Sequence, residues 1–97
     1  DFMETTEKIS ELAKVALALP LTPGVYKMYD KNGKIIYVGK SKALKNRVSQ
    51  YFQNISQHNA KTARMVKEVD RFECVFTDTE TEALVLENEL IKLHSPK

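Results

Sequence analysis

The feature that most constrains the fold is a pair of short strand-like segments joined by a turn signal. The segment 24–30 begins with Gly24-Val25-Tyr26, and the segment 34–40 ends with Tyr37-Val38-Gly39-Lys40. Asn32-Gly33 lies between them and is a strong signal for a hairpin turn. One hairpin therefore carries two phenols, a lysine and two glycines.

The hairpin register decides whether Tyr26 and Tyr37 share a face of the sheet. A two-residue loop at Asn32-Gly33 pairs Tyr26 with Gly39 and makes the two tyrosines diagonal neighbours on one face. A type I turn over residues 30–33 with a glycine bulge shifts the register by one residue and separates them. The sequence leaves both registers open.

The rest of the chain is predicted to place helices around a third strand. Apolar residues recur at helical spacing over residues 5–18, 42–54, 60–69 and 79–93, and they alternate over residues 71–77. Thr79 and Glu82 fit a capping box at the start of the last helix. The predicted fold class is α/β, with a small three-stranded, mainly antiparallel sheet flanked by helices.

Length and composition indicate one domain. A chain of 97 residues with 42% hydrophobic residues is sufficient for one small core. We expect a single domain over residues 1–97, with a leading helix within 1–20 and the functional core within 21–97. The longest apolar stretch, residues 15–21, is broken by Pro20, so we expect no membrane span and a soluble, cytoplasmic protein.

Charge is distributed unevenly along the chain, although the net charge is only +2. Residues 27–67 contain ten Lys or Arg and one acid, whereas residues 68–97 contain eight acids and three basic residues. Because Lys and Arg bind nucleic acids by displacing condensed counterions, the basic segment suggests a phosphate-facing surface. An ordinary solvated face is the alternative.

Two predicted helices carry further candidate residues. Arg47 and Tyr51 are four residues apart, so they can point at the same ligand. On the last helix, Glu87 falls near the centre of a predicted apolar arc. A carboxylate on a core-facing arc is costly unless it is paired with a cation or bound to a metal. The arc consists of Ala83, Leu84, Leu86, Leu90 and Ile91.

Together these residues resemble the signature of the GIY-YIG nucleases, with Val in place of Ile in both triplets. The resemblance is strongest to the UvrC-type branch of the family and spans about residues 19–97. The family domain usually continues with an asparagine beyond Lys97, so we expect an excised N-terminal fragment of a longer protein. The matching segments are 22–26, 37–42, 44–47, 49–52, 81–87 and 91–92.

The resemblance implies a GIY-YIG nuclease fold and an endodeoxyribonuclease that makes the 3′ incision in nucleotide excision repair. The implied substrate is double-stranded DNA containing a lesion, and a UvrB-type partner subunit would bind regions outside this chain. A stand-alone or exonuclease-fused UvrC-like repair nuclease is one alternative. A nucleic-acid-binding module that does not cut is another.

The resemblance also implies the site residues. The position that matches the metal-binding glutamate is Glu87, and a single Mg²⁺ or Mn²⁺ is the expected cofactor because hard oxygen ligands suit both ions. The implied catalytic residues are Tyr26, Tyr37, Lys40, Arg47, Tyr51 and Glu87.

Residue chemistry suggests roles within this set. The guanidinium of Arg47 fits a phosphate as an electrostatic clamp. Either Tyr26 or Tyr37 would accept the proton of the attacking water. Because an unperturbed tyrosine has a pKa near 10, an adjacent cation is needed, and Lys40 is the candidate. We further expect Lys42 and Lys45 to bind DNA together with Arg47, and Gly24 and Gly39 to have structural roles.

Overall fold

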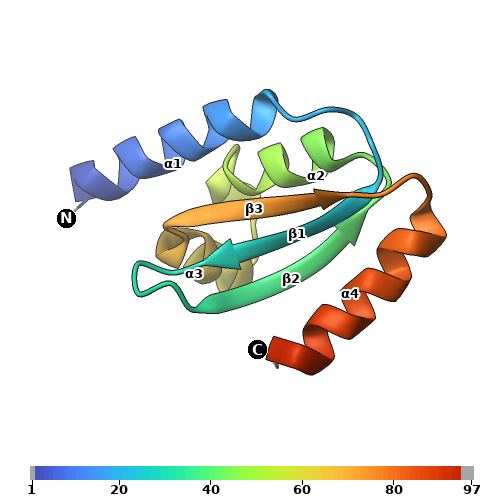
Figure 1. Ribbon diagram of the computed structural model, residues 1–97. Coiled ribbons are helices and arrows are strands. Elements are labelled where there is room, and N and C mark those ends of the chain that lie inside the picture. The colour runs from blue at the N-terminus through green and yellow to red at the C-terminus, as the bar shows by residue number, and fades with distance from the viewer. Residues whose placement is uncertain (1, 95–97) are drawn as a thin grey trace.

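In the computed structural model, which describes residues 2–94, a three-stranded sheet forms the centre of the molecule (Figure 1). Its strands are β1 (Gly24–Tyr29), β2 (Ile35–Ser41) and β3 (Arg71–Phe76). β1 lies in the middle and pairs antiparallel with both neighbours. The predicted antiparallel sheet is confirmed, and β2 is one of its two edge strands.

The β1–β2 turn has the glycine bulge that the sequence allowed. The Asp30 N–H donates to the Lys34 carbonyl over 2.9 Å, and the Gly33 N–H donates to the Asp30 carbonyl over 3.0 Å. Gly33 has a φ of 80°, which glycine adopts without strain. Tyr29 consequently pairs with Ile35.

A second irregularity in the hairpin cancels the first. The register shifts again between Met28 and Tyr29, so that Ile36 is an extra residue on β2. Beyond this point Met28 pairs with Tyr37, and Tyr26 with Gly39. The turn therefore follows one predicted alternative, whereas the pairing around the tyrosines follows the other.

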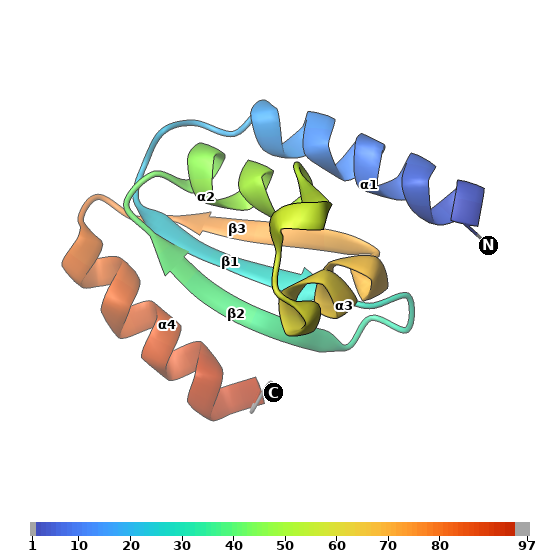
Figure 2. The same cartoon turned by 180° about the vertical axis from the view of Figure 1, so that it is seen from behind.

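Helices cover both faces of the sheet. α1 (Phe2–Leu17), α2 (Leu44–Tyr51) and α3 (Ala60–Glu68) pack on one face, and α4 (Glu80–His94) packs on the other, as the two opposite views show (Figures 1 and 2). The short 3₁₀ helix η1 (Ile55–Gln57) connects α2 to α3. Within residues 2–94, none of the helices is both long enough and apolar enough to cross a membrane.

α2 is shorter than predicted at both ends. The Ser41 hydroxyl accepts a hydrogen bond from the Ala43 N–H over 2.9 Å, which holds a turn before Leu44. At the other end, Asn54 adopts a left-handed conformation with a φ of 51°. The helix therefore ends at Tyr51, and the chain turns toward η1.

The two faces of the sheet carry separate cores. Alternate residues of a strand point to opposite faces, so Tyr26 and Met28 face α2 whereas Val25 and Val38 face α4. Val25 and Val38 form the smaller core with Ala83, against which Leu86 and Leu90 pack. The larger core consists of Leu12, Ala16, Tyr26, Met28, Leu44, Val48, Phe52, Val66 and Val69.

The buried side of α4 differs from the predicted apolar arc. Leu84 and Ile91 are 44% and 40% exposed. The reason is that α4 packs mainly against β1 and β2 through Ala83 and the two leucines that pack with it, Leu86 and Leu90. The inclusion of Leu84 and Ile91 in the arc was wrong. Glu87 consequently lies half-buried at the margin of the packed side and not at its centre.

The start of α4 agrees with the predicted cap. The Thr79 hydroxyl oxygen accepts a hydrogen bond from the Glu82 N–H over 3.1 Å. The same hydroxyl donates to the Glu82 carboxylate over 3.3 Å. The cap fixes where α4 begins and therefore which of its residues face β2.

Candidate active site

Three tyrosines from three elements meet on the sheet face that α2 covers. Tyr26 comes from β1, Tyr37 from β2 and Tyr51 from the end of α2. Their ring centroids are 5.9, 5.7 and 6.1 Å apart for the pairs 26–37, 26–51 and 37–51. The hydroxyls of Tyr26 and Tyr51 are 2.8 Å apart. We call these three residues the tyrosine cluster.

Gly39 gives the Tyr26 ring its place in the cluster. A Cβ at Gly39 would lie 2.4 Å from both Cζ and the hydroxyl of Tyr26, closer than real side chains approach. Gly24 is similarly enclosed, because a Cβ there would lie 2.4 Å from the Val75 carbonyl oxygen and 2.6 Å from a Leu44 methyl. The two glycines thus permit close packing at the cluster and at the start of β1.

Burial raises the pKa of two tyrosines of the cluster, Tyr26 and Tyr51. Tyr26 is 2% exposed, and burial raises its pKa well above the ordinary value, with a further rise from its hydrogen bond to Tyr51. Burial also raises the pKa of Tyr51, whereas the hydrogen bond with Tyr26 lowers it. Burial therefore holds the Tyr26 phenol in its neutral form, while Tyr37 is only half-buried.

Arg47 supplies the positive charge beside the cluster. It is exposed, and it precedes Tyr51 by one turn of α2. Burial and the contacts among the tyrosines have the larger effects on the pKa of Tyr26 and of Tyr51. The charge of Arg47 has a smaller effect, and it lowers the pKa of both. Arg47 and Tyr51 therefore act in the same space, as their spacing predicted.

Lys40 does not lie beside Tyr37 as the sequence suggested. It pairs with Val25, so its side chain leaves the sheet on the α4 face, whereas Tyr37 points to the α2 face. Lys40 instead lines a hollow of about 390 Å³ at the end of β2. The lining residues are Lys40, Ser41, Lys42, Ala43, Asn46, Arg47, Gln50, Glu80 and Ala83.

This hollow brings together three of the predicted cationic residues. Lys40, Lys42 and Arg47 line it, and Glu80 is the acid among its lining residues. Lys45 is half-buried and does not line it. The hollow thus supplies a local excess of positive charge next to the tyrosine cluster.

Glu87 lies on a different element from the tyrosine cluster. It projects from α4, and within residues 2–94 its carboxylate forms no hydrogen bond or ion pair. The structural salt bridge that the sequence allowed is therefore absent from this part of the chain. α4 runs beside the edge strand β2 in both views, so this edge of the sheet is flanked by α4 on the face opposite the tyrosine cluster (Figures 1 and 2).

The donor set for a metal is small. Within residues 2–94, no three His, Cys, Asp or Glu side chains are grouped so that they would hold a metal ion. A half-buried carboxylate without a cationic partner still fits Mg²⁺, which is commonly held through one or two carboxylates and keeps several waters. Glu87 fits a single hard cation of this kind.

Tyr29, the remaining strand tyrosine, has a packing role. Its hydroxyl donates to the Glu73 carboxylate over 2.8 Å, and the Arg71 guanidinium lies 3.8 Å from its ring centroid. Arg71 also donates to Glu73 over 2.8 Å. These contacts connect β1 to β3 away from the tyrosine cluster.

Sequence reasoning did not single out His58, because this residue lies in a polar connection between two predicted helices. Its Nε2 lies 3.0 Å from the carbonyl oxygen of Tyr51, and the two rings are 6.4 Å apart. The left-handed turn at Asn54 returns the chain to the end of α2. In the sequence, Asn54 is the signal for this turn, because asparagine tolerates the left-handed conformation.

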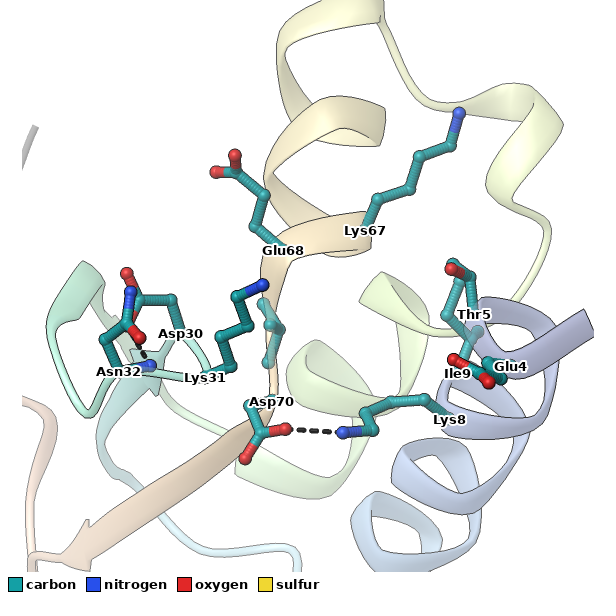
Figure 3. A pocket seen from close by; sticks show the side chains of 11 residues that line it. Glu4, Thr5, Lys8, Ile9, Asp30, Lys31, Asn32, Lys67, Glu68 and Asp70 are labelled. Carbon is teal, nitrogen blue, oxygen red and sulfur yellow. Dashed lines mark hydrogen bonds and ion pairs between the residues drawn. The ribbon is translucent and has the colours of Figure 1, made fainter. Parts of the chain in front are cut away.

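A separate hollow of about 520 Å³ lies at the hairpin tip, between α1 and the end of α3 (Figure 3). Both lysines and acidic residues line this hollow, and Lys8 forms an ion pair with Asp70 across it. None of the predicted site residues belongs to this hollow.

The sheet topology, the cluster on the glycine-containing hairpin and the adjacent Arg47 define a GIY-YIG nuclease domain. Residues 22–97 match the sequence model of the family described as UvrC-like GIY-YIG domain. Since this match covers most of the chain, the chain belongs to that family.

Curated relatives agree with this assignment. Over 79 residues the chain is 61% identical to UvrABC system protein C of Caldicellulosiruptor saccharolyticus and 60% identical to that of Clostridium beijerinckii. Each match covers 81% of this chain and 13% of the relative. The chain thus corresponds to a small part of those proteins.

Solved structures show the same fold. The GIY-YIG N-terminal endonuclease domain of UvrC from Thermotoga maritima, bound to magnesium as its catalytic divalent cation, matches with a TM-score of 0.79 and 39% identity. The match covers 90% of this chain and 93% of that domain. The predicted fold and family are therefore confirmed.

Proposed function

We propose that this chain is a divalent-metal-dependent DNA endonuclease domain that makes the 3′ incision in nucleotide excision repair. The observation that carries the proposal is the tyrosine cluster beside Arg47, within a fold shared with a UvrC endonuclease domain. Hydrolysis of a phosphodiester needs a proton acceptor, positive charge at the phosphate and stabilisation of the leaving oxygen. The chain has residues suited to each task.

Tyr37 is the proton acceptor in this proposal. Tyr26 is buried and is held neutral, so it is unsuited to accept a proton from water. Tyr51 shares a hydrogen bond with Tyr26, and when the Tyr26 hydroxyl is the donor, the O–H of Tyr51 can donate to Tyr37 or to a phosphate oxygen. A donor beside Tyr37 would stabilise its phenolate, which is the form that can take the proton of the attacking water.

Arg47 binds the scissile phosphate. Its side chain is exposed, and its planar fork matches two phosphate oxygens at once. Lys40, Lys42 and Lys45 add positive charge along the DNA backbone. Lys40 acts here from the hollow at the end of β2 and not as the partner of Tyr37.

Glu87 would hold one divalent cation, Mg²⁺ or Mn²⁺. When bound, such a cation supplies positive charge to the phosphate and to the leaving oxygen. In three variants of the T. maritima domain a single tyrosine is replaced by phenylalanine and the catalytic divalent cation is bound. This supports a cation site that does not depend on any one of those hydroxyls.

The relatives named UvrABC system protein C support a proposal for the biological setting. The substrate is lesion-containing double-stranded DNA, the partner is a UvrB-type subunit that binds outside this chain, and the compartment is the cytoplasm. We also propose that residues 21–97 form the nuclease core and that residues 1–20 add a leading helix. Leu12 and Ala16 of α1 are buried against that core.

A nicking assay tests the proposal. Supercoiled plasmid and a lesion-containing duplex are incubated with the chain, and with the full-length protein and its partner subunits, in Mg²⁺, Mn²⁺ or EDTA. The proposal predicts incision with either metal and none in EDTA. Incision that is equally fast in EDTA, or no incision by the complete system in any metal, would overturn it.

A further inference from the structure

The exposed side of α2 carries a second hollow next to the tyrosine cluster. Its volume is about 270 Å³, and it lies between α2 and the start of α3. We call it the α2–α3 hollow. It is lined by Arg47, Gln50, Tyr51, His58 and Thr62.

Arg47 joins this hollow to the one at the end of β2. Arg47 and Gln50 line both hollows and form a ridge between them. On one side of the ridge lie Lys40 and Lys42, and on the other lie Tyr51, His58 and Thr62. A strand whose scissile phosphate is bound by Arg47 would therefore have both hollows beside it.

The position of His58 in this hollow is fixed by the fold. A carbonyl oxygen only accepts, so Nε2 of His58 donates to the Tyr51 carbonyl over 3.0 Å. This bond satisfies a carbonyl at the end of α2, where helices leave carbonyls without partners. Within residues 2–94, Nδ1 of His58 forms no hydrogen bond, so this nitrogen is open to a ligand.

Thr62 is fixed from the other side. The Asn59 side chain caps α3 by accepting a hydrogen bond from the Thr62 N–H over 2.8 Å. The hydroxyl of Thr62 forms no hydrogen bond within the described part of the chain. The hollow thus presents a hydroxyl, an amide and an imidazole beside a guanidinium, and none of its lining residues between positions 2 and 94 is acidic.

We infer that the α2–α3 hollow binds the phosphate of the cleaved strand that neighbours the scissile phosphate. This inference rests on the proposed nuclease function and adds His58 and Thr62 to the DNA contacts. Phosphate oxygens are commonly bound by Arg together with hydroxyl and amide donors, which are the groups assembled here. Such a contact fixes the register of the strand over the tyrosine cluster and carries no sequence preference.

Binding measurements in EDTA test the inference without cleavage. Fluorescence anisotropy of a short labelled duplex is measured for Thr62→Val and His58→Ala, with Thr81→Val and His94→Ala on α4 as matched controls. Loss of one hydrogen bond predicts roughly three- to tenfold weaker binding for each hollow variant and less than a twofold change for the controls. Equal affinities for all four variants would overturn the inference.

A second measurement locates the contact and separates the inference from the nuclease proposal. The full-length protein with its partner subunits is given a lesion duplex with a neutral methylphosphonate on either side of the scissile phosphate. One of the two neutral substitutions should slow the wild type roughly three- to tenfold and have no further effect on Thr62→Val. Thermal melts check that the variants are folded.

The outcomes are distinct. Normal incision that is indifferent to both methylphosphonates would overturn the inference and leave the nuclease proposal intact. The same would follow if a methylphosphonate slowed the wild type and Thr62→Val to the same extent. No incision of the unmodified duplex by the wild type would overturn both.

Discussion

The hydroxyl groups of Tyr26 and Tyr51 lie 2.8 Å apart and connect the buried central strand to the end of α2. Because burial raises the pKa of Tyr26, its phenol stays neutral within this hydrogen bond. We therefore assign Tyr26 a positioning role and Tyr37 the role of proton acceptor.

Replacing Tyr37 with phenylalanine should slow incision by about 10² to 10⁴, the range for loss of a general base. Tyr26→Phe removes only one hydrogen bond to Tyr51 and should cost roughly tenfold. Tyr29→Phe is the control, since its hydroxyl binds Glu73 away from the cluster. Single-turnover incision rates compare the three, and a Tyr26→Phe defect larger than that of Tyr37→Phe would reverse the assigned roles.

The buried phenol of Tyr26 should make the domain less stable at high pH. Its pKa is raised in the folded state above the ordinary 10.0, so its stabilising effect is complete below pH 10 and is lost as the pH rises above that value. Urea unfolding on both sides of pH 10 should show a falling free energy of unfolding. The decline should be shallower in Tyr26→Phe, and identical slopes in the two proteins would show that Tyr26 is not held neutral.

Arg47→Ala should lose roughly 10² to 10³ in incision rate, the usual loss for one preorganised transition-state contact. The side chain is exposed, so the melting temperature should not change. Arg47→Lys should restore little of the rate because it lacks the bidentate fork. Near-normal incision by Arg47→Ala would make this residue an ordinary surface arginine.

Neutralising Lys42 and Lys45 together should weaken DNA binding and flatten its dependence on salt. Each lost phosphate contact should reduce the slope of log K against log salt by about 0.9. Binding isotherms at several salt concentrations measure this slope. Lys31→Gln with Lys34→Gln at the hairpin tip is a control of equal charge, and an equal loss in both double variants would indicate a diffuse effect of net charge.

The hairpin and its tyrosines were predictable from sequence because local signals define them. Asn32-Gly33 specifies the turn, and Gly39 leaves space for the Tyr26 ring. The exact register was not predictable, since the bulge at the turn is cancelled by a second bulge at Ile36. Either irregularity alone would have separated Tyr26 from Tyr37.

Tertiary packing determined the parts that were not predicted. Leu84 and Ile91 match a helical period, but α4 packs mainly against β1 and β2, so both remain exposed. Lys40 is close to Tyr37 in sequence, yet strand alternation sends the two side chains to opposite faces. His58 reaches Tyr51 only because the chain reverses at Asn54.

Glu87→Gln is the most direct test of the central claim that this chain is a metal-dependent nuclease domain. Glu87 has no ion-pair partner within residues 2–94, so the amide should leave the melting temperature in EDTA unchanged. If Glu87 instead had a buried cationic partner, the loss would be about 3–5 kcal/mol.

Melting temperatures and incision rates of wild type and Glu87→Gln are therefore measured together, each in EDTA and in Mn²⁺. We predict that Mn²⁺ raises the melting temperature of the wild type alone, and that Glu87→Gln does not incise DNA. A Glu87→Gln protein that retains metal-dependent incision per folded molecule would contradict the account.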